Sequence, residues 1–334
     1  MKGRAAGLPV TITGLGCKVP DRVMTNDDLA EVVETSDEWI TSRTGIRERR
    51  FATDAEAMSD LALPAARAAL EQAGIRPQDI DLIIVATVTP DMDFPATATI
   101  VADQLGASDA AAYDLSAGCT GFMYALAQGH ASVAAGLAKK ALVIGGDILS
   151  RILDRSDRST LVLFGDGAGA VVLEQVDEAG FLGFELGADG SGGPDLNYPG
   201  SGSRIPTNGE RRFLQMNGRE VYKFATRVLV SSAEELLDTC GYTVGDVDVY
   251  VPHQANIRII DHAVSKLGFP EEKVVVNVDR FGNTSSGSIP LALADAARDG
   301  RLEPGRLVLM TGMGAGLTWG SALIRWTQPM GANR

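Results

Sequence analysis

The chain carries an internal repeat at a spacing of half its length. The segment 73–84, AGIRPQDIDLII, matches the segment 240–251, CGYTVGDVDVYV, so that Gly74 corresponds to Gly241 at an offset of 167 in a chain of 334 residues. A further match pairs 169–173 with 320–324. Each half contains a helix, a short turn, an apolar strand and a loop, which predicts two similar α/β units.

The strands expected in these units are predicted to be buried on both faces. The segments 82–85, 142–144, 249–251 and 307–310 are continuous apolar runs, which are typical of sheets covered by helices on both sides. Two such units packed about a pseudo-twofold axis predict an α/β fold with a five-layered αβαβα core. We place the halves at residues 1–180 and 181–334, joined around an irregular glycine-rich loop at 187–203.

Composition excludes several classes of partner. The formal charge of −13 argues against nucleic acid, and an anionic ligand would need a local cluster of Lys and Arg. No segment approaches the roughly 18 apolar residues of a membrane span, and residues 1–16 lack a signal-peptide core. Three cysteines at 17, 119 and 240 match neither a disulfide framework nor a metal site. We therefore expect a cytoplasmic protein without membrane or metal.

Cys119 is the candidate nucleophile. It ends the segment DLSAGC, which follows a strand-like run and precedes an expected apolar helix at 122–137. In α/β folds, ligands bind beyond the carboxyl ends of the strands, where equivalent loops of the two halves converge. A thiol at a helix N-terminus is placed where the dipole favours the thiolate.

His253 and Asn283 are the expected partners of this thiol. His253 follows the apolar strand 249–251 after Pro252, whereas His130 lies 11 residues along the helix from the cysteine, or roughly 16 Å away. His262 falls in the middle of a helix, so we expect it and His130 to be packing or surface residues. Asn283 is matched to the cysteine by pairing 114–118 with 279–282, after a small length adjustment.

Several motifs together resemble the β-ketoacyl-acyl-carrier-protein synthase III family, condensing enzymes of the thiolase-fold superfamily. The resemblance covers nearly the whole chain and rests on TSDEWI at 35–40, RTGIRER at 43–49, AGC at 117–119, FGDGAGA at 164–170, VPHQAN at 251–256 and GNTS at 282–285. The glycine motif alone would be a weak phosphate-loop match. The resemblance implies a thiolase-like duplicated fold and the priming reaction of type II fatty-acid synthesis.

The family chemistry gives each residue type a role. The resemblance implies that Cys119 accepts the acyl group of an acyl-CoA and that His253 and Asn283 bind malonyl-acyl-carrier-protein and stabilise the enolate formed as CO2 leaves. It also implies an oxyanion hole built from the backbone N–H groups of Cys119 and Ala315. CoA enters as a substrate, and we expect no cofactor.

The resemblance also implies a coenzyme A site. Thr35 and Glu38 look like a capping box that starts a helix, which would bring Trp39 and Arg43 onto one face for contact with adenine and phosphate. The positions matching the family's coenzyme A site are Thr35, Trp39, Arg43, Arg158, Gly218, Asn256 and Arg258.

Two partner surfaces follow from the same resemblance. An acidic carrier protein requires positive charge at the tunnel mouth, for which the candidates are Arg219, Lys223, Arg258 and Lys266. Phe94 matches a position that the partner subunit contributes to the floor of the acyl pocket, so we expect a homodimer. A bulky ring there favours a short primer such as acetyl without excluding branched or longer chains.

Other classes of protein use the same residues. A thiolase-fold enzyme of secondary metabolism, such as a polyketide synthase or acyltransferase, would use Cys, His and Asn with a different acceptor. A papain-like hydrolase combines the same three residue types but lacks the repeat and the coenzyme A motifs. A non-catalytic carrier-binding protein typically loses the cysteine, which this chain keeps.

Overall fold

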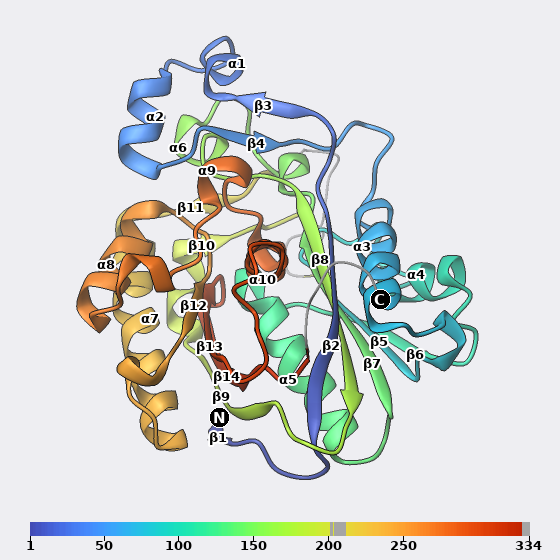
Figure 1. The fold of residues 1–334 in the computed structure, drawn as a ribbon. Helices are drawn as coiled ribbons and strands as arrows, with labels where there is room; N and C mark the ends of the chain where they lie inside the picture. The colour runs from blue at the N-terminus through green and yellow to red at the C-terminus, as the bar shows by residue number, and fades with distance from the viewer. Residues whose placement is uncertain (201–202, 204–211, 329–334) are drawn as a thin grey trace.

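Two five-stranded sheets form the centre of the molecule (Figure 1). The computed structural model describes residues 1–200, 203 and 212–328. The N-terminal sheet has the order β2-β8-β7-β5-β6 and the C-terminal sheet the order β1-β9-β14-β13-β12. Their strands are β1 (Lys2–Arg4), β2 (Val10–Lys18), β5 (Leu82–Ala86), β6 (Ala111–Leu115), β7 (Lys140–Asp147), β8 (Gly167–Gln175), β9 (Phe181–Ala188), β12 (Val249–Pro252), β13 (Leu307–Gly314) and β14 (Thr318–Arg325).

The two sheets share a pairing pattern. β5 pairs in parallel with β7, as β12 does with β13, and β8 and β14 are the antiparallel neighbours on the other side. The counterpart of β6 in the second sheet is reduced to a single parallel bridge between Tyr250 and Val274. Two small antiparallel pairs lie outside the sheets, β3 (Val23–Thr25) with β4 (Glu48–Arg50) and β10 (Leu196–Asn197) with β11 (Gln215–Met216).

Helices cover both sheets, so the five-layered α/β architecture is confirmed. α3 (Met58–Ala73) and α4 (Thr97–Leu105) pack on the outer face of the N-terminal sheet, on the right of Figure 1. α5 (Gly121–Ala134) and α10 (Ser288–Arg298) lie between the sheets. α7 (Gly218–Cys240) covers the outer face of the C-terminal sheet, with α8 (Ile257–Leu267) packed against it. The apolar runs of the central strands are buried accordingly.

Short helices shape the loops above the sheets. These are α1 (Asn26–Ala30), α2 (Asp37–Thr44), α6 (Arg158–Leu161) and α9 (Val278–Phe281), together with the 3-10 turns η2 (Gly118–Thr120), η4 (Gly190–Asp195) and η7 (Ser285–Gly287). The segment expected as an irregular loop thus contains η4 and β10, and its residues 201 and 202 lie outside the described residues. No helix among the described residues is long and apolar enough to cross a membrane.

The structure corrects one pairing between the halves. η2 and η7 begin at residues 118 and 285, and α5 and α10 at residues 121 and 288, both at the offset of 167 seen for Gly74 and Gly241. This register pairs Cys119 with Ser286 and not with Asn283. The sequence match had aligned Asp114, which lies in strand β6, with Asp279, which lies in helix α9.

Candidate active site

Cys119, His253 and Asn283 line one cavity of about 500 Å³. Cys119 lies in η2, between β6 and α5, and His253 directly follows β12. Asn283 follows α9 through Gly282, whose φ of 63° turns the chain. The cavity is bordered by the first turns of α7 and α8. The loops of both halves therefore bring these three side chains to one space.

Two glycines allow the end of β13 and the turn η2 to approach each other closely beside Cys119. A Cβ atom added to Gly314, the last residue of β13, would lie 2.6 Å from the backbone nitrogen of Cys119. A Cβ atom added to Gly118, whose φ is 57°, would lie 2.8 Å from the nitrogen of Ala315. The segments 118–119 and 314–315 are thus in direct contact, at the place where the sequence analysis expects the oxyanion hole.

The resting thiol of Cys119 is neutral. Burial raises its pKa to about 11, a hydrogen bond from Ser285 opposes the rise, and the charge of Asp147 adds to it. The side chain is only partly exposed. The position at the helix N-terminus is thus not accompanied by a lowered pKa, because desolvation outweighs the hydrogen bonds that favour the thiolate.

His253 is held by one ring nitrogen. It is buried, and its Nδ1 lies 2.5 Å from the Oγ of Ser288, the first residue of α10. Its Nε2 has no hydrogen-bond partner among the described residues. Burial lowers the pKa of His253 to about 3, so the imidazole is neutral near pH 7. The ring can offer a hydrogen bond to a ligand but does not bring a positive charge.

Asn283 is fixed through both its backbone and its side chain. Its N–H donates to Leu163 O at 2.8 Å, and its C=O accepts from Gly165 N at 3.0 Å. Its Oδ1 accepts from Ser285 N at 2.9 Å. Because the amide oxygen is already engaged, the NH2 group is the part of the side chain left for a ligand.

The glycine motif at 164–170 supports the asparagine and is not a phosphate loop. A Cβ atom at Gly165 would lie 2.2 Å from Phe281 O, so only glycine lets the motif reach the backbone near Asn283. Asp166 is buried and accepts from Ala52 N and from the N–H and hydroxyl of Ser150. Burial raises its pKa to about 6 against these hydrogen bonds.

Three supporting residues escaped the sequence analysis. Asp147 is fully buried at the end of β7 and accepts from Thr87, from the backbone of residues 88 and 89, and from Ser286. Ser285 and Ser288 contact Asn283 and His253. The available signals were the place of Ser285 at the end of the motif 282–285, the position of Ser288 three residues beyond it, and the position of Asp147 after an apolar strand.

A second cavity of about 450 Å³ meets the first at Cys119. Its wall is mostly apolar and includes Val88, Leu149, Ile152, Leu196 and Leu214. Phe94 is absent from this lining and is 82 % exposed. One cavity therefore opens beside α7 and α8, and the other offers an apolar space on the far side of the cysteine.

The residues matched to coenzyme A binding fall into two groups. Gly218, Asn256 and Arg258 line the first cavity. Trp39 instead forms a stack with two guanidinium groups, the Cζ of Arg158 lying 4.5 Å and that of Arg43 5.3 Å from its ring centroid.

The expected capping box at Thr35 is wrong. Ser36 is the N-cap of α2, and its side chain accepts from Trp39 N at 3.1 Å. The Oγ1 atom of Thr35 is buried, and no residue that the structure describes is its hydrogen-bond partner. Ser36 has the extended backbone that an N-cap requires. The helix therefore starts one residue later than a cap at Thr35 would place it.

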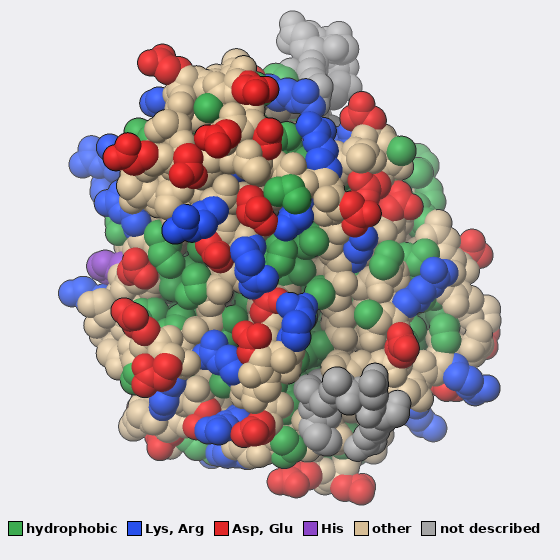
Figure 2. Space-filling model, turned by 45° about the horizontal axis from the view of Figure 1, so that its top comes forward, with side chains coloured by type: hydrophobic (Ala, Val, Ile, Leu, Met, Phe, Trp, Pro, Cys, Tyr) green, Lys and Arg blue, Asp and Glu red, His purple; other side chains and the backbone are tan. Residues whose placement is uncertain are grey.

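All four candidate docking cations are exposed. Arg219, Lys223 and Arg258 border the first cavity, whereas Lys266 lies in the last turn of α8 and does not. Lys223 pairs with Glu220 at 2.7 Å. Lys and Arg side chains border hydrophobic surface near the middle of the face shown in Figure 2, with acidic side chains spread among them. The positive charge on this face is thus interrupted by acidic groups.

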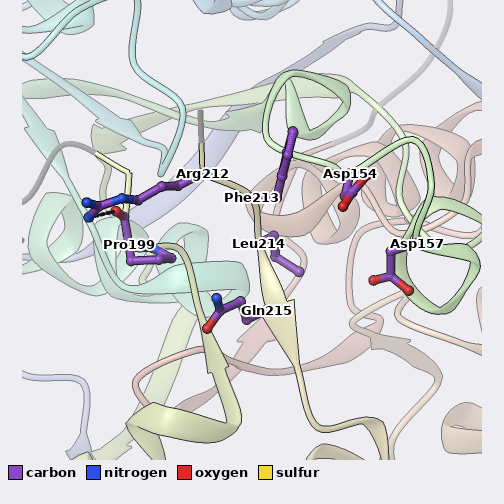
Figure 3. Close-up of a pocket in the computed structure, with 7 residues that line it drawn as sticks. All are labelled: Asp154, Asp157, Pro199, Arg212, Phe213, Leu214 and Gln215. Atoms are coloured by element: carbon purple, nitrogen blue, oxygen red, sulfur yellow. Dashed lines mark hydrogen bonds between the residues drawn. The ribbon is translucent and has the colours of Figure 1, made fainter. Parts of the chain in front are cut away.

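A third cavity contains none of the candidate residues. It is lined by residues 154, 157, 199 and 212–215 (Figure 3). The guanidinium of Arg212 lies beside Pro199, whose carbonyl it contacts at 3.3 Å, and away from Asp154 and Asp157. Asp154 accepts from Ser156, and Asp157 caps α6.

The other two histidines lie outside the candidate site. His130 packs against the rings of Phe181 and Phe184 at 5.1 Å each, and burial lowers its pKa to about 4. His262 is half-buried in α8. Neither lines the two cavities that meet at the cysteine.

Comparison with known proteins gives a consistent assignment. Residues 113–190 match the family described as 3-oxoacyl-[acyl-carrier-protein] synthase III, and residues 237–326 match its C-terminal family. The chain is 55% identical to the beta-ketoacyl-[acyl-carrier-protein] synthase III of Symbiobacterium thermophilum, over 95% of this chain and 98% of that protein. It is 53% identical to the protein of that name from Desulfitobacterium hafniense, over 96% and 98%. The crystal structure of the Thermus thermophilus synthase III superposes with a TM-score of 0.90 at 51% identity, covering 94% and 98%.

Proposed function

Because this chain belongs to the β-ketoacyl-acyl-carrier-protein synthase III family, we propose that Cys119, His253 and Asn283 carry out its condensation. The enzyme joins an acyl-CoA primer to malonyl-acyl-carrier-protein and releases CoA and CO2, the initiating reaction of type II fatty-acid synthesis. The observation that carries the residue assignment is the convergence of these three side chains on one cavity.

In the first step the sulfur of Cys119 attacks the thioester carbonyl of acyl-CoA. A C–S bond forms to the enzyme, the C–S bond to CoA breaks, and the thiol proton leaves with the CoA thiolate. The backbone N–H groups of Cys119 and Ala315 stabilise the tetrahedral oxyanion. This role is supported by the direct contact between segments 118–119 and 314–315. The acyl chain enters the apolar cavity beyond the cysteine.

In the second step malonyl-acyl-carrier-protein occupies the first cavity. The Nε2 atom of His253 and the NH2 group of Asn283 donate to its thioester carbonyl, and the enolate forms as the bond to CO2 breaks. The carbanion then attacks the acyl carbonyl and expels the Cys119 thiolate. Two neutral donors suit this step, because they stabilise the developing negative charge without losing protons to it.

The entrance binds the substrate nucleotide and the carrier protein. Trp39, with Arg43 and Arg158, binds the adenine and phosphates, and Thr35, Gly218, Asn256 and Arg258 complete the coenzyme A path. In support, the stack around Trp39 combines a π surface with two cations. Arg219, Lys223, Arg258 and Lys266 contact the acidic carrier protein.

The enzyme is a cytoplasmic homodimer in which Phe94 of the partner subunit closes the acyl cavity. This proposal is supported by the 82 % exposure of Phe94 and by the partly exposed edge strand β6, in which Tyr113 is 40% exposed. An edge strand with exposed large side chains is typically covered by another chain. The three cysteines are free, as expected in a reducing compartment.

Intact-protein mass spectrometry tests the assignment directly. Wild type and Cys119→Ala are incubated with acetyl-CoA, and malonyl-acyl-carrier-protein is then added. We expect one acetyl adduct on the wild type only, discharged as 3-oxobutanoyl-carrier-protein. The absence of an adduct across acetyl, branched and longer acyl-CoAs would refute the proposed nucleophile.

A further inference from the structure

The hydroxyl of Ser288 is placed to decide where the proton of His253 resides. Both residues are buried, and the Oγ of Ser288 makes two contacts, with Gln254 N at 3.2 Å and His253 Nδ1 at 2.5 Å. A backbone N–H can only donate, so Oγ is the acceptor toward Gln254. The single proton of the hydroxyl is then available for the imidazole.

From these two hydrogen bonds of the Ser288 hydroxyl, we propose that Ser288 is a positioning residue that holds His253 in its Nε2–H tautomer. The proposal rests on the function proposed above. In the opposite tautomer, Nδ1–H would donate to Oγ, which would then accept twice, and the buried hydroxyl proton would lack an acceptor among the contacts described for it. An unmatched buried polar hydrogen is costly, which disfavours that arrangement.

The remaining ring nitrogen is the one that faces the substrate. His253 lines the first cavity, and its Nε2 is buried without a hydrogen-bond partner in the part of the chain that the structure describes. With the proton on Nε2, this atom donates to the thioester carbonyl of the malonyl group. With the proton on Nδ1, the same atom would present a lone pair to the enolate oxygen and repel it.

Hydrogen bonds made by Gln254 fix the position of Ser288 relative to the imidazole ring. The side chain of Gln254 donates to Pro252 O at 2.8 Å and to Val275 O at 3.0 Å, and accepts from Asn277 N at 2.9 Å. The backbone N–H that contacts Ser288 is therefore anchored by the side chain of the same residue. Burial keeps the imidazole neutral, so the choice is between two tautomers.

Nitrogen-15 NMR of the histidine ring tests the proposal without using activity. His130→Gln and His262→Gln variants identify the signals of His253. We expect a protonated Nε2 and an unprotonated Nδ1 in the wild type, and a mixture of both tautomers in Ser288→Ala. Ser286→Ala is the matched control, since it removes a buried hydroxyl two residues before Ser288, and this hydroxyl contacts Asp147 and not the ring. A wild-type signal from Nδ1–H would overturn the proposal.

Kinetics separate positioning from folding. We expect Ser288→Ala to form the acetyl adduct on Cys119 at the normal rate but to release CO2 from malonyl-acyl-carrier-protein about 10- to 100-fold more slowly. This loss is smaller than the roughly 100- to 1000-fold loss of rate that follows deletion of an oxyanion donor. Ser288→Thr, which keeps the hydroxyl, should restore the rate. An unchanged rate together with an unchanged ring signal would also overturn the proposal. A wild type that releases no CO2 would instead refute the proposed function, while the ring signal still decides the tautomer.

Discussion

The reactive side chains of the resting protein are neutral. Burial raises the pKa of Cys119 to about 11 and lowers that of His253 to about 3. A thiolate–imidazolium pair of the kind that activates cysteine hydrolases would require both shifts to run the other way. The site is therefore suited to stabilising an enolate by hydrogen bonds, which requires donors and no resident ion pair.

The neutral thiol predicts a pH dependence for alkylation. Because only the thiolate reacts and the pKa of Cys119 is raised, the fraction of thiolate grows with pH until the pH approaches about 11. We expect the rate of modification by iodoacetamide at Cys119, followed by peptide mapping, to keep rising through about pH 9, past the ordinary thiol pKa of about 8.5. A plateau below about pH 8 would mean that a positive charge stabilises the thiolate.

Substitution of Trp39 should weaken the binding only of substrates that carry the nucleotide. The substitution Trp39→Leu keeps an apolar side chain but removes the ring on which the adenine stacks. The lost interaction contributes about 1–2 kcal/mol to binding, so we expect KM for acetyl-CoA to rise about 10-fold. The control is acetyl-N-acetylcysteamine, a thioester without the nucleotide, whose rate should not change. An equal loss with both substrates would indicate damage to the fold.

At the scale of elements, three loops are tied together beneath the site. Asp147, at the end of β7, accepts from residues 87–89 after β5 and from Ser286 in η7. These segments belong to different halves of the chain, and the contacts span up to 139 residues. A buried, fully hydrogen-bonded carboxylate of this kind orders several backbone segments at once.

The close contact of β13 with η2 predicts that a larger residue at position 314 would displace the backbone of Cys119. In Gly314→Ala the new Cβ atom would lie 2.6 Å from Cys119 N, so the backbone must shift. We expect acetylation of Cys119 to fall about 100-fold, since one oxyanion donor would be displaced, and the free energy of unfolding to drop by about 1–3 kcal/mol. Gly190→Ala is the control, because no atom of the described residues lies within 4 Å of its added Cβ atom. Full acetylation by Gly314→Ala would contradict the oxyanion assignment.

At the scale of the whole molecule, two similar sheets place their loops around shared cavities. The exposed ring of Phe94 lies outside these cavities, and the edge strand β6 borders the second cavity with Asp114 and Leu115 at its end. If a second subunit covers them, chain-length selection becomes a property of the dimer. The same surface would then serve both assembly and specificity.

Mixed dimers test whether Phe94 acts across the interface. We expect Phe94→Ala to shift preference toward longer or branched acyl-CoAs by about 10-fold relative to acetyl-CoA, since removing a ring enlarges the pocket. In a dimer that pairs Phe94→Ala with Cys119→Ala, the one intact cysteine faces a wild-type ring in the partner subunit. Such dimers should regain the wild-type preference. A preference that stays broad would place the effect within one subunit.

The sequence alone was sufficient to predict the duplicated architecture and to predict that His253 lies near Cys119. Apolar runs and glycine C-caps are local signals, and both halves carry them at the same spacing, as the matching turns at Gly74 and Gly241 show. Helix geometry separated His130 from Cys119 without any coordinates. These inferences needed only neighbours in sequence.

The tertiary structure decided what depends on contacts between distant residues. Pairing Asn283 with Cys119 was wrong because strand and helix cannot be told apart in a short match, and the register instead selects Ser286. The N-cap at Ser36 depends on backbone angles, and the neutral thiol depends on how completely other segments cover it. The support that Ser288 gives His253 spans 35 residues. Desolvation and hydrogen-bond pairing are properties of the packed molecule, and no local pattern in the chain encodes them.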